Sequence, residues 1–197
     1  MAHVYKYDVF ISYQRDSPTV APWVRTHFHQ LLCELLDDNT DEEISVYYDE
    51  EGRAGGLWPV EIRHALRHSR VLVPVCSPKY FRREWCMAEW HSMQSREKIA
   101  GLGTLERPFG LIHPVIYSDS EYFPKYVHER RTVDLRPWNF PEPHFQDTPA
   151  FLDLRRALTR FAIDLIDALD LVPRWRPDWP IEMPPPEPPT RSRKPRF

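Results

Sequence analysis

Short runs of β-branched and aromatic residues alternate along the chain with stretches in which apolar residues recur every three or four positions. The short runs are typical of β-strands, and the longer spacing is typical of one face of a helix. The runs predict strands over residues 7–13, 44–48, 71–76, 111–116 and 132–135. The helical spacing predicts helices over residues 23–36, 60–68, 85–100 and 151–169, with a short irregular element over 122–131.

Alternating strands and helices are typical of an α/β fold in which helices cover both faces of a parallel sheet. Five strands of these lengths predict a flavodoxin-like, three-layer fold with a five-stranded parallel sheet in the order 2-1-3-4-5. Ligands of such folds bind in the crevice where the strand order reverses, at the carboxyl ends of strands one and three. The candidate chemistry is therefore expected in the loops that follow residues 7–13 and 71–76.

The stretch SPKYFRREWCMAEW, residues 77–90, follows the third strand and opens a helix near Trp85. On that helix Glu89 lies four residues after Trp85 and three after Cys86, so its carboxylate shares a face with an indole and a thiol. A carboxylate in an apolar setting has a raised pKa or a specific partner, and both are common at active sites. A solvated glutamate near a helix N-terminus has the same spacing, so the spacing alone leaves both interpretations open.

The composition changes after residue 170, because nine of the 21 prolines lie in the last 25 residues. Proline removes backbone donors and favours polyproline II, so this segment is not expected to fold as a core. We therefore expect one domain over residues 1–170 and a proline-rich C-terminal tail or linker over 171–197. Two arrangements stay open for this segment: a spacer toward a partner, or a tail packed by Trp175 and Trp179.

Charge and cysteine content restrict the class of protein. The net charge of −3 provides no basic field for direct binding of nucleic acid. No apolar run is long enough to span a membrane, and the first ten residues lack an apolar signal segment. The three cysteines form no C-x-x-C pair, which favours reduced thiols over disulfides or structural zinc. We therefore expect a cytoplasmic protein that binds neither nucleic acid directly nor membrane.

Several common catalytic motifs are absent from the sequence. No G-x-G-x-x-G follows a strand and no G-x-x-x-x-G-K-[ST] occurs, so neither a bound redox NAD nor ATP hydrolysis has a signature here. Ser77 lacks the G-x-S-x-G elbow of serine hydrolases. His64 and His68 share a helix face without a third ligand in register, so no metal site is expected. A phosphorylated receiver is disfavoured because Cys76 and Ser77 stand where an aspartate would follow strand three.

Three motifs in order resemble a TIR domain, the module named for Toll/interleukin-1 receptor and resistance proteins. They are YDVFISY over residues 7–13, YYDEEGRAGGLWPVEIRHAL over 47–66 and SRVLVPVCSPKYFRREWCMAEW over 69–90. They resemble the family's opening strand, its second strand with the glycine-bearing BB loop, and its third strand with the W-C-x-x-E helix. The resemblance covers about residues 6–169 and is topological after residue 90. The three motifs together are more specific than any one of them.

The resemblance implies one of two kinds of function. Some TIR domains in bacteria, plants and animal axons cleave the nicotinamide–ribose bond of NAD+, whereas others are adaptors that self-associate through the BB loop. In the enzymatic, bacterial-type branch the essential glutamate maps to Glu89 and the tryptophan before it to Trp85. A basic residue after the first strand maps to Arg15, although Gln14 stands where some relatives have a second basic residue.

The chemistry of N-glycosidic cleavage suits a single carboxylate. The ribosyl cation is oxocarbenium-like, and departing nicotinamide loses its pyridinium charge, so a strong general acid is unnecessary. Glu89 is therefore the expected catalytic residue, and Trp85 is expected to stack on a ring of the substrate. The other expected substrate contacts are Tyr13, Arg15, Ser17, Asp49 and Ser77, and the expected interaction residues of the BB loop are Gly55, Gly56, Leu57 and Trp58.

The resemblance, with these residues, implies an NAD+ nucleosidase that uses NAD+ as its substrate, without a cofactor, and releases nicotinamide with ADP-ribose or a cyclic ADP-ribose. Its expected partners are further copies in a homo-oligomer or filament and a partner protein or fused sensor, in bacterial anti-phage defence or signalling. The alternative is a non-enzymatic TIR–TIR adaptor, which the apolar Leu57 and Trp58 and the missing second basic residue would fit.

Overall fold

The structure is a computed structural model, and it describes residues 4–49, 58–182 and 184. Its described strands form one sheet, and they are β1 (Tyr7–Ser12), β2 (Val46–Tyr48), β3 (Ser69–Cys76), β4 (Val115–Ile116) and β5 (Val133–Asp134). The strand order is β2-β1-β3-β4-β5, and every neighbouring pair is parallel. The flavodoxin-like prediction is therefore confirmed, including the reversal of strand order between β1 and β3.

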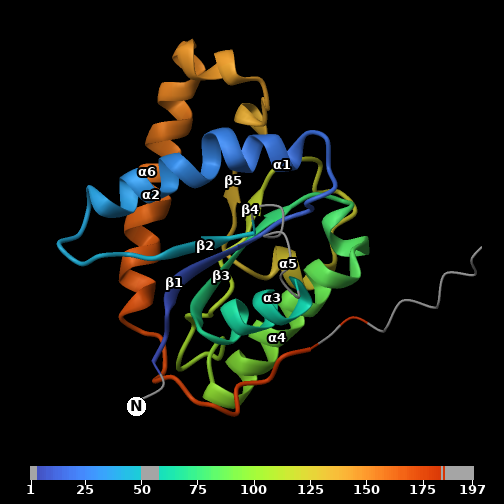
Figure 1. Ribbon diagram of the computed structural model, residues 1–197, viewed down its shortest axis with the longest axis vertical. Helices are drawn as coiled ribbons and strands as arrows, with labels where there is room; N and C mark the ends of the chain where they lie inside the picture. The colour runs from blue at the N-terminus through green and yellow to red at the C-terminus, as the bar shows by residue number, and fades with distance from the viewer. Residues whose placement is uncertain (1–3, 50–57, 183, 185–197) are drawn as a thin grey trace, which may run out of the picture.

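Helices cover both faces of this sheet (Figure 1). One face carries α1 (Val20–Trp23), α2 (His29–Asp37) and the long α6 (Pro149–Leu169), and a π-helical turn, Val24–Phe28, joins α1 to α2. The other face carries α3 (Trp58–Arg67), α4 (Glu84–Ala100) and the short α5 (Lys125–His128). Short 3-10 turns are formed by Tyr80–Arg82, Arg136–Trp138 and Pro143–Asp147. None of the described helices is long and apolar enough to cross a membrane.

The central strand β3 contains the continuous apolar run of residues 71–76, and its position in the sheet explains that run. Val71, Val73 and Val75 belong to the core cluster on the α2 and α6 side, whereas Leu72 and Cys76 belong to the cluster on the α3 and α4 side. All five side chains are fully buried. A parallel strand that is covered on both faces has no solvent side, so both sets of alternating residues are apolar.

Two element boundaries differ from the prediction because of proline. The strand predicted over 111–116 is regular only at Val115–Ile116, since Pro114 has no N–H to donate to the ladder. Pairing with β3 nevertheless begins earlier, because Leu72 donates its backbone N–H to the Leu111 carbonyl at 2.8 Å. In α3 the helix begins at Trp58, two residues before the predicted start, and Pro59 suits a first helical turn.

The proline-rich segment packs onto the domain as far as Glu182, past the predicted boundary at residue 170. Trp179 is 3% exposed, and the guanidinium of the buried Arg96 lies 5.4 Å from its ring. Trp175 stacks on His68 and donates to the Arg67 carbonyl at 3.2 Å. The second of the two open arrangements therefore describes residues 171–182, because two indoles supply the apolar area that proline lacks. The rest of the tail, except Pro184, lies outside the described residues.

This packing predicts that the tail contributes to stability. Trp179→Ala removes a buried indole from the surface of α4, and we expect the free energy of unfolding to fall by about 3 kcal/mol. Urea denaturation of the full chain measures the change. Leu105→Ala is the matched control, because Leu105 is 97% exposed and its truncation should leave stability unchanged. Equal stability of Trp179→Ala and the parent protein would show that the segment is only loosely attached.

Candidate active site

Glu89 lies beneath the point where the strand order reverses. It is carried by α4, which follows β3 after the turn at Tyr80–Arg82, and its side chain is directed at the end of β1. There Ser12 donates from its Oγ to Glu89 Oε2 at 2.5 Å. Glu89 is only 5% exposed, so the interpretation as a solvated surface glutamate is wrong for this residue. The carboxylate is buried at the expected crevice.

Burial dominates the ionisation of Glu89. It raises the pKa of the carboxyl group from its ordinary 4.5 to about 7, and the Asp49 charge adds to this increase. The hydrogen bond from Ser12 and the nearby Arg15 cation act in the opposite direction and lower the pKa. Near neutral pH the group is therefore divided between its ionised and protonated forms, which is common for carboxyl groups at active sites.

Arg15 and Asp49 bring the first two loops together beside this carboxylate. Arg15 Nη1 forms an ion pair with the Asp49 carboxylate, and Tyr13 donates its hydroxyl to the Asp49 backbone carbonyl at 2.6 Å. Tyr13 and Arg15 follow β1, whereas Asp49 follows β2. Three of the predicted contact residues thus form one cluster at the carboxyl ends of two adjacent strands.

Ser17 and Ser77 occupy the same edge, but their hydroxyl oxygens bind local backbone. Ser17 Oγ accepts from the Val20 N–H at 3.1 Å, at the start of α1. Ser77 Oγ accepts from the Tyr80 N–H at 3.2 Å and so stabilises the turn that leads into α4. Both side chains are buried. Each serine has a structural role, and its contact with a substrate stays a prediction.

Trp85 lies one helical turn before Glu89, as its spacing predicts. It is half-buried against the core cluster of α3 and α4, and it therefore combines a packed edge with an accessible part. The predicted BB-loop residues Gly55, Gly56 and Leu57 lie outside the described residues. Trp58 is the first residue of α3 rather than a loop residue, and its side chain also lies outside the described part.

Ser12 and Tyr80 are parts of the site that the sequence reasoning missed. The hydroxyl of Tyr80 lies 2.7 Å from Ser12 Oγ and 3.3 Å from the Cys86 carbonyl, and its side chain is fully buried. Alternation along β1 gave one signal: Ser12 lies on the same face as Phe10, which packs with α3 and α4. A polar residue at the end of an apolar strand, on the face of the Glu89 helix, was therefore visible in the sequence.

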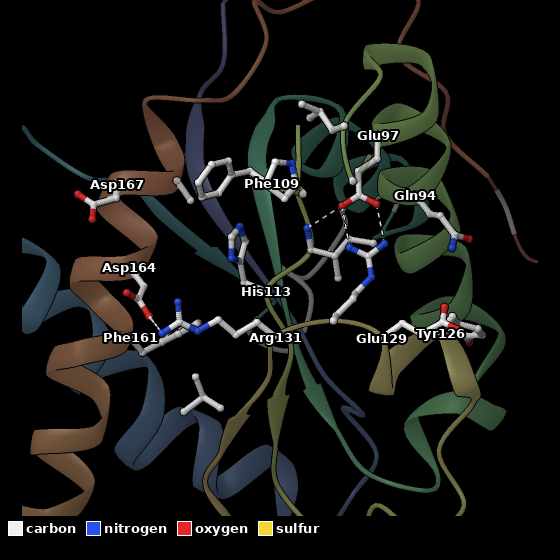
Figure 2. A pocket seen from close by; sticks show the side chains of 18 of the residues that line it. Gln94, Glu97, Phe109, His113, Tyr126, Glu129, Arg131, Phe161, Asp164 and Asp167 are labelled. Carbon is white, nitrogen blue, oxygen red and sulfur yellow. Dashed lines mark hydrogen bonds and ion pairs between the residues drawn. The ribbon is translucent and has the colours of Figure 1, made fainter. Parts of the chain in front are cut away.

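A cavity of about 660 Å³ lies at the other end of the sheet (Figure 2). It is bordered by the later halves of α4 and α6 and by the segments before β4 and β5. Arg130 forms a two-pronged ion pair with Glu97, at 2.8 and 2.6 Å, and Glu97 also accepts from the Leu111 N–H at 2.6 Å. Arg131 pairs with Asp164 at 3.3 Å. These charges neutralise one another within the protein, and Glu97 lies about 12 Å along α4 from Glu89.

The described residues contain no group of three or more His, Cys, Asp or Glu side chains placed to hold a metal ion. His64 and His68 stack on each other with ring centroids 4.4 Å apart.

Comparison with known proteins decides the family. A family model described as TIR domain matches residues 9–148, which is more than half of the chain. This chain belongs to the TIR domain family. The match begins within β1 and includes β3 and the W-C-x-x-E helix, so Glu89 and Trp85 lie inside the matched region.

One solved structure supports the fold of this TIR domain, and a second is a weaker match. The TIR domain of the Toll-related receptor TRR-2 from Hydra magnipapillata is 20% identical, with a TM-score of 0.50, and the match covers 82% of this chain and 99% of that one. The TIR domains of the activated Roq1 resistosome, which directly recognises the effector XopQ, are also 20% identical, with a TM-score of 0.41 and coverages of 84% and 96%. At 20% identity the likeness to the TRR-2 domain shows the fold alone. Among curated proteins no significant match was found.

The buried carboxyl group predicts a pH-dependent gain of stability for Glu89→Gln. Because the pKa is raised in the folded protein, the wild type loses stability as the pH increases from about 4.5 through about 7. Glutamine cannot ionise, so the variant should gain about 3 kcal/mol relative to the wild type across this interval. Urea denaturation of both proteins between these pH values measures the difference. A difference that does not change with pH would mean that Glu89 ionises as freely as in the unfolded chain.

Proposed function

We propose that this TIR domain is an NAD+ nucleosidase of the bacterial-type branch, which cleaves the bond between nicotinamide and ribose. The observation that carries the proposal is the position of Glu89: a buried carboxylate at the crevice, hydrogen-bonded by Ser12, one helical turn after Trp85. The W-C-x-x-E motif that resembles the enzymatic branch supplies both side chains. NAD+ is the substrate, and no further cofactor takes part in the proposed reaction.

The proposed step breaks the bond between ribose C1′ and the pyridinium nitrogen. Its electron pair stays on nicotinamide, which leaves as a neutral molecule, and the ribosyl group becomes an oxocarbenium-like cation. Ionised Glu89 stabilises this cation electrostatically or traps it covalently. Water then adds at C1′ and loses a proton, which gives ADP-ribose; attack by a nitrogen of the adenine ring instead gives a cyclic product.

The remaining residues bind and orient the substrate in this proposal. Trp85 offers an indole face to a cationic or aromatic ring. Arg15 offers a guanidinium to the diphosphate, and it would exchange its bond with Asp49 for bonds to phosphate oxygens. Tyr13, Ser17, Asp49 and Ser77 lie at the same strand ends and complete the proposed contacts.

The proposed biological setting is a cytoplasmic, homo-oligomeric protein in bacterial defence or signalling. A TIR–TIR contact through the BB loop would raise the fraction of competent sites, so turnover per molecule should increase with protein concentration. A sensor, fused or separate, would supply the trigger for assembly.

Nicotinamide release by the purified chain is the direct test. Glu89→Gln preserves the shape of the side chain and removes its charge, and we expect turnover to fall at least about a hundredfold. Glu84→Gln is the matched control, because Glu84 is an exposed glutamate in the first turn of the same helix. Liquid chromatography of the products at high protein concentration measures nicotinamide and distinguishes linear from cyclic ADP-ribose.

The adaptor function makes the opposite set of predictions. Under it, neither the parent protein nor Glu84→Gln releases nicotinamide, even at concentrations at which light scattering detects assembly. Combined replacement of Leu57 and Trp58 by alanine then abolishes assembly, whereas Glu89→Gln leaves assembly unchanged. Such results would overturn the proposed nucleosidase.

A further inference from the structure

Ser12 is a buried polar residue at the end of an apolar strand. Ser12 is 1% exposed, and its hydroxyl group lies within hydrogen-bond distance of a carboxylate oxygen and of a second hydroxyl group. Glu89 Oε2 is 2.5 Å away on α4, and the Tyr80 hydroxyl is 2.7 Å away in the turn after β3. A residue of β1 therefore meets a residue of the turn after β3 and a residue of α4, both more than 60 positions later in the sequence, at one hydroxyl oxygen.

The number of protons fixes the direction of these hydrogen bonds. An ionised carboxylate only accepts, so Ser12 must donate its one proton to Glu89. Ser12 Oγ can then only accept from Tyr80, which makes a chain from Tyr80 through Ser12 to Glu89. A hydrogen bond to an ionised acceptor is stronger than a neutral one, and a second donor behind it polarises it further.

The chain has a second complete arrangement when Glu89 is protonated. Glu89 then donates to Ser12, Ser12 donates to Tyr80, and Tyr80 donates to the Cys86 carbonyl, which lies 3.3 Å from its hydroxyl. No hydroxyl proton of the three side chains is left without an acceptor in either arrangement. The site therefore holds the carboxyl group in one orientation through a change of its charge.

We propose that Ser12 is a positioning residue for Glu89, and that its hydroxyl, supported by Tyr80, orients the carboxylate and stabilises its ionised form. The hydrogen-bond role follows from the geometry alone. Its meaning for catalysis rests on the proposed nucleosidase, because only that reaction needs an oriented carboxylate anion at this place. The resemblance to TIR domains assigned no role to the hydroxyl of Ser12 or to that of Tyr80.

The other groups that face Glu89 leave it as the group that titrates near neutrality. Arg15 and Asp49, from the loops after β1 and β2, carry opposite charges and form an ion pair with each other. Burial raises the pKa of Tyr80 in the turn after β3 and of Cys86 on α4 well above their ordinary values. Burial likewise raises the pKa of Tyr47 on β2 and of Cys76 on β3. These four groups are therefore neutral at pH 7.

The test measures the pKa of Glu89 directly and needs no NAD+. The side-chain carboxyl carbon of Glu89 is followed by ¹³C NMR in glutamate-labelled full-length protein, and the spectrum of Glu89→Gln assigns its resonance. In Ser12→Ala the ionised form loses its donor, so the pKa should rise by about one pH unit. Ser12→Cys keeps the shape of the side chain with a slightly larger atom and a weaker donor, so a smaller rise is expected. This second variant keeps the test decisive if the alanine variant folds poorly.

Ser69→Ala is the matched control. Ser69 is a fully buried serine on β3, and its Oγ donates to the Ala65 carbonyl at 2.7 Å, away from Glu89. Its loss should lower stability and leave the pKa of Glu89 unchanged. An unchanged pKa in Ser12→Ala and Ser12→Cys, or an equal rise in Ser69→Ala, overturns the role of Ser12. In the separate assay with NAD+, absence of nicotinamide release from the parent protein and every variant would instead refute the nucleosidase. The effect of Ser12 on the pKa of Glu89 would still stand.

Discussion

The structure depends on one constraint, which is that both faces of the parallel sheet are buried. The central parts of β1 and β3, residues 9–11 and 71–76, have no solvent side, so they are apolar and buried. A polar group at the end of such a strand has to find its partner inside the protein. Ser12 finds it in Glu89 of α4 and in Tyr80 of the connecting turn. The hydroxyl group of Ser12 thus belongs both to a buried strand of the fold and to the candidate site.

The buried carboxyl group of Glu89 lowers the stability of the folded protein, and contacts in other parts of the chain offset this loss. A carboxyl group whose pKa is raised by burial makes the folded state less stable at and above neutral pH. The tail adds packing on the same helix, since Trp179 covers the buried Arg96 and Glu182 donates its N–H to Ser92 Oγ at 2.8 Å. The contacts of the tail thus reach α4 at its middle, Ser92, and at its later half, Arg96, whereas Glu89, whose ionisation costs stability, lies in its first half.

The sequence predicted the fold well because its signals were local and repeated. Alternating apolar runs and helical spacings fixed the five strands and their order, and Glu89 lies at the predicted crevice. The sequence did not predict the contacts between side chains that lie far apart in the chain. Nothing local indicates that Tyr80 reaches Ser12, or that Trp175 stacks on His68, because these contacts join residues about 70 and 107 positions apart. For the tail, the sequence left two arrangements open, and only the contacts of Trp175 and Trp179 decide that residues 171–182 pack onto the domain.

The pH dependence of kcat/KM for nicotinamide release tests the central claim most directly, because it joins the buried carboxyl group to the proposed reaction. This quantity reports ionisations of the free enzyme. If ionised Glu89 is the catalytic group, kcat/KM should be level above about pH 7 and fall about tenfold for each pH unit below it. A value of kcat/KM that is independent of pH from 5.5 to 8.5 would contradict the account, because the reaction would then proceed without ionisation of Glu89.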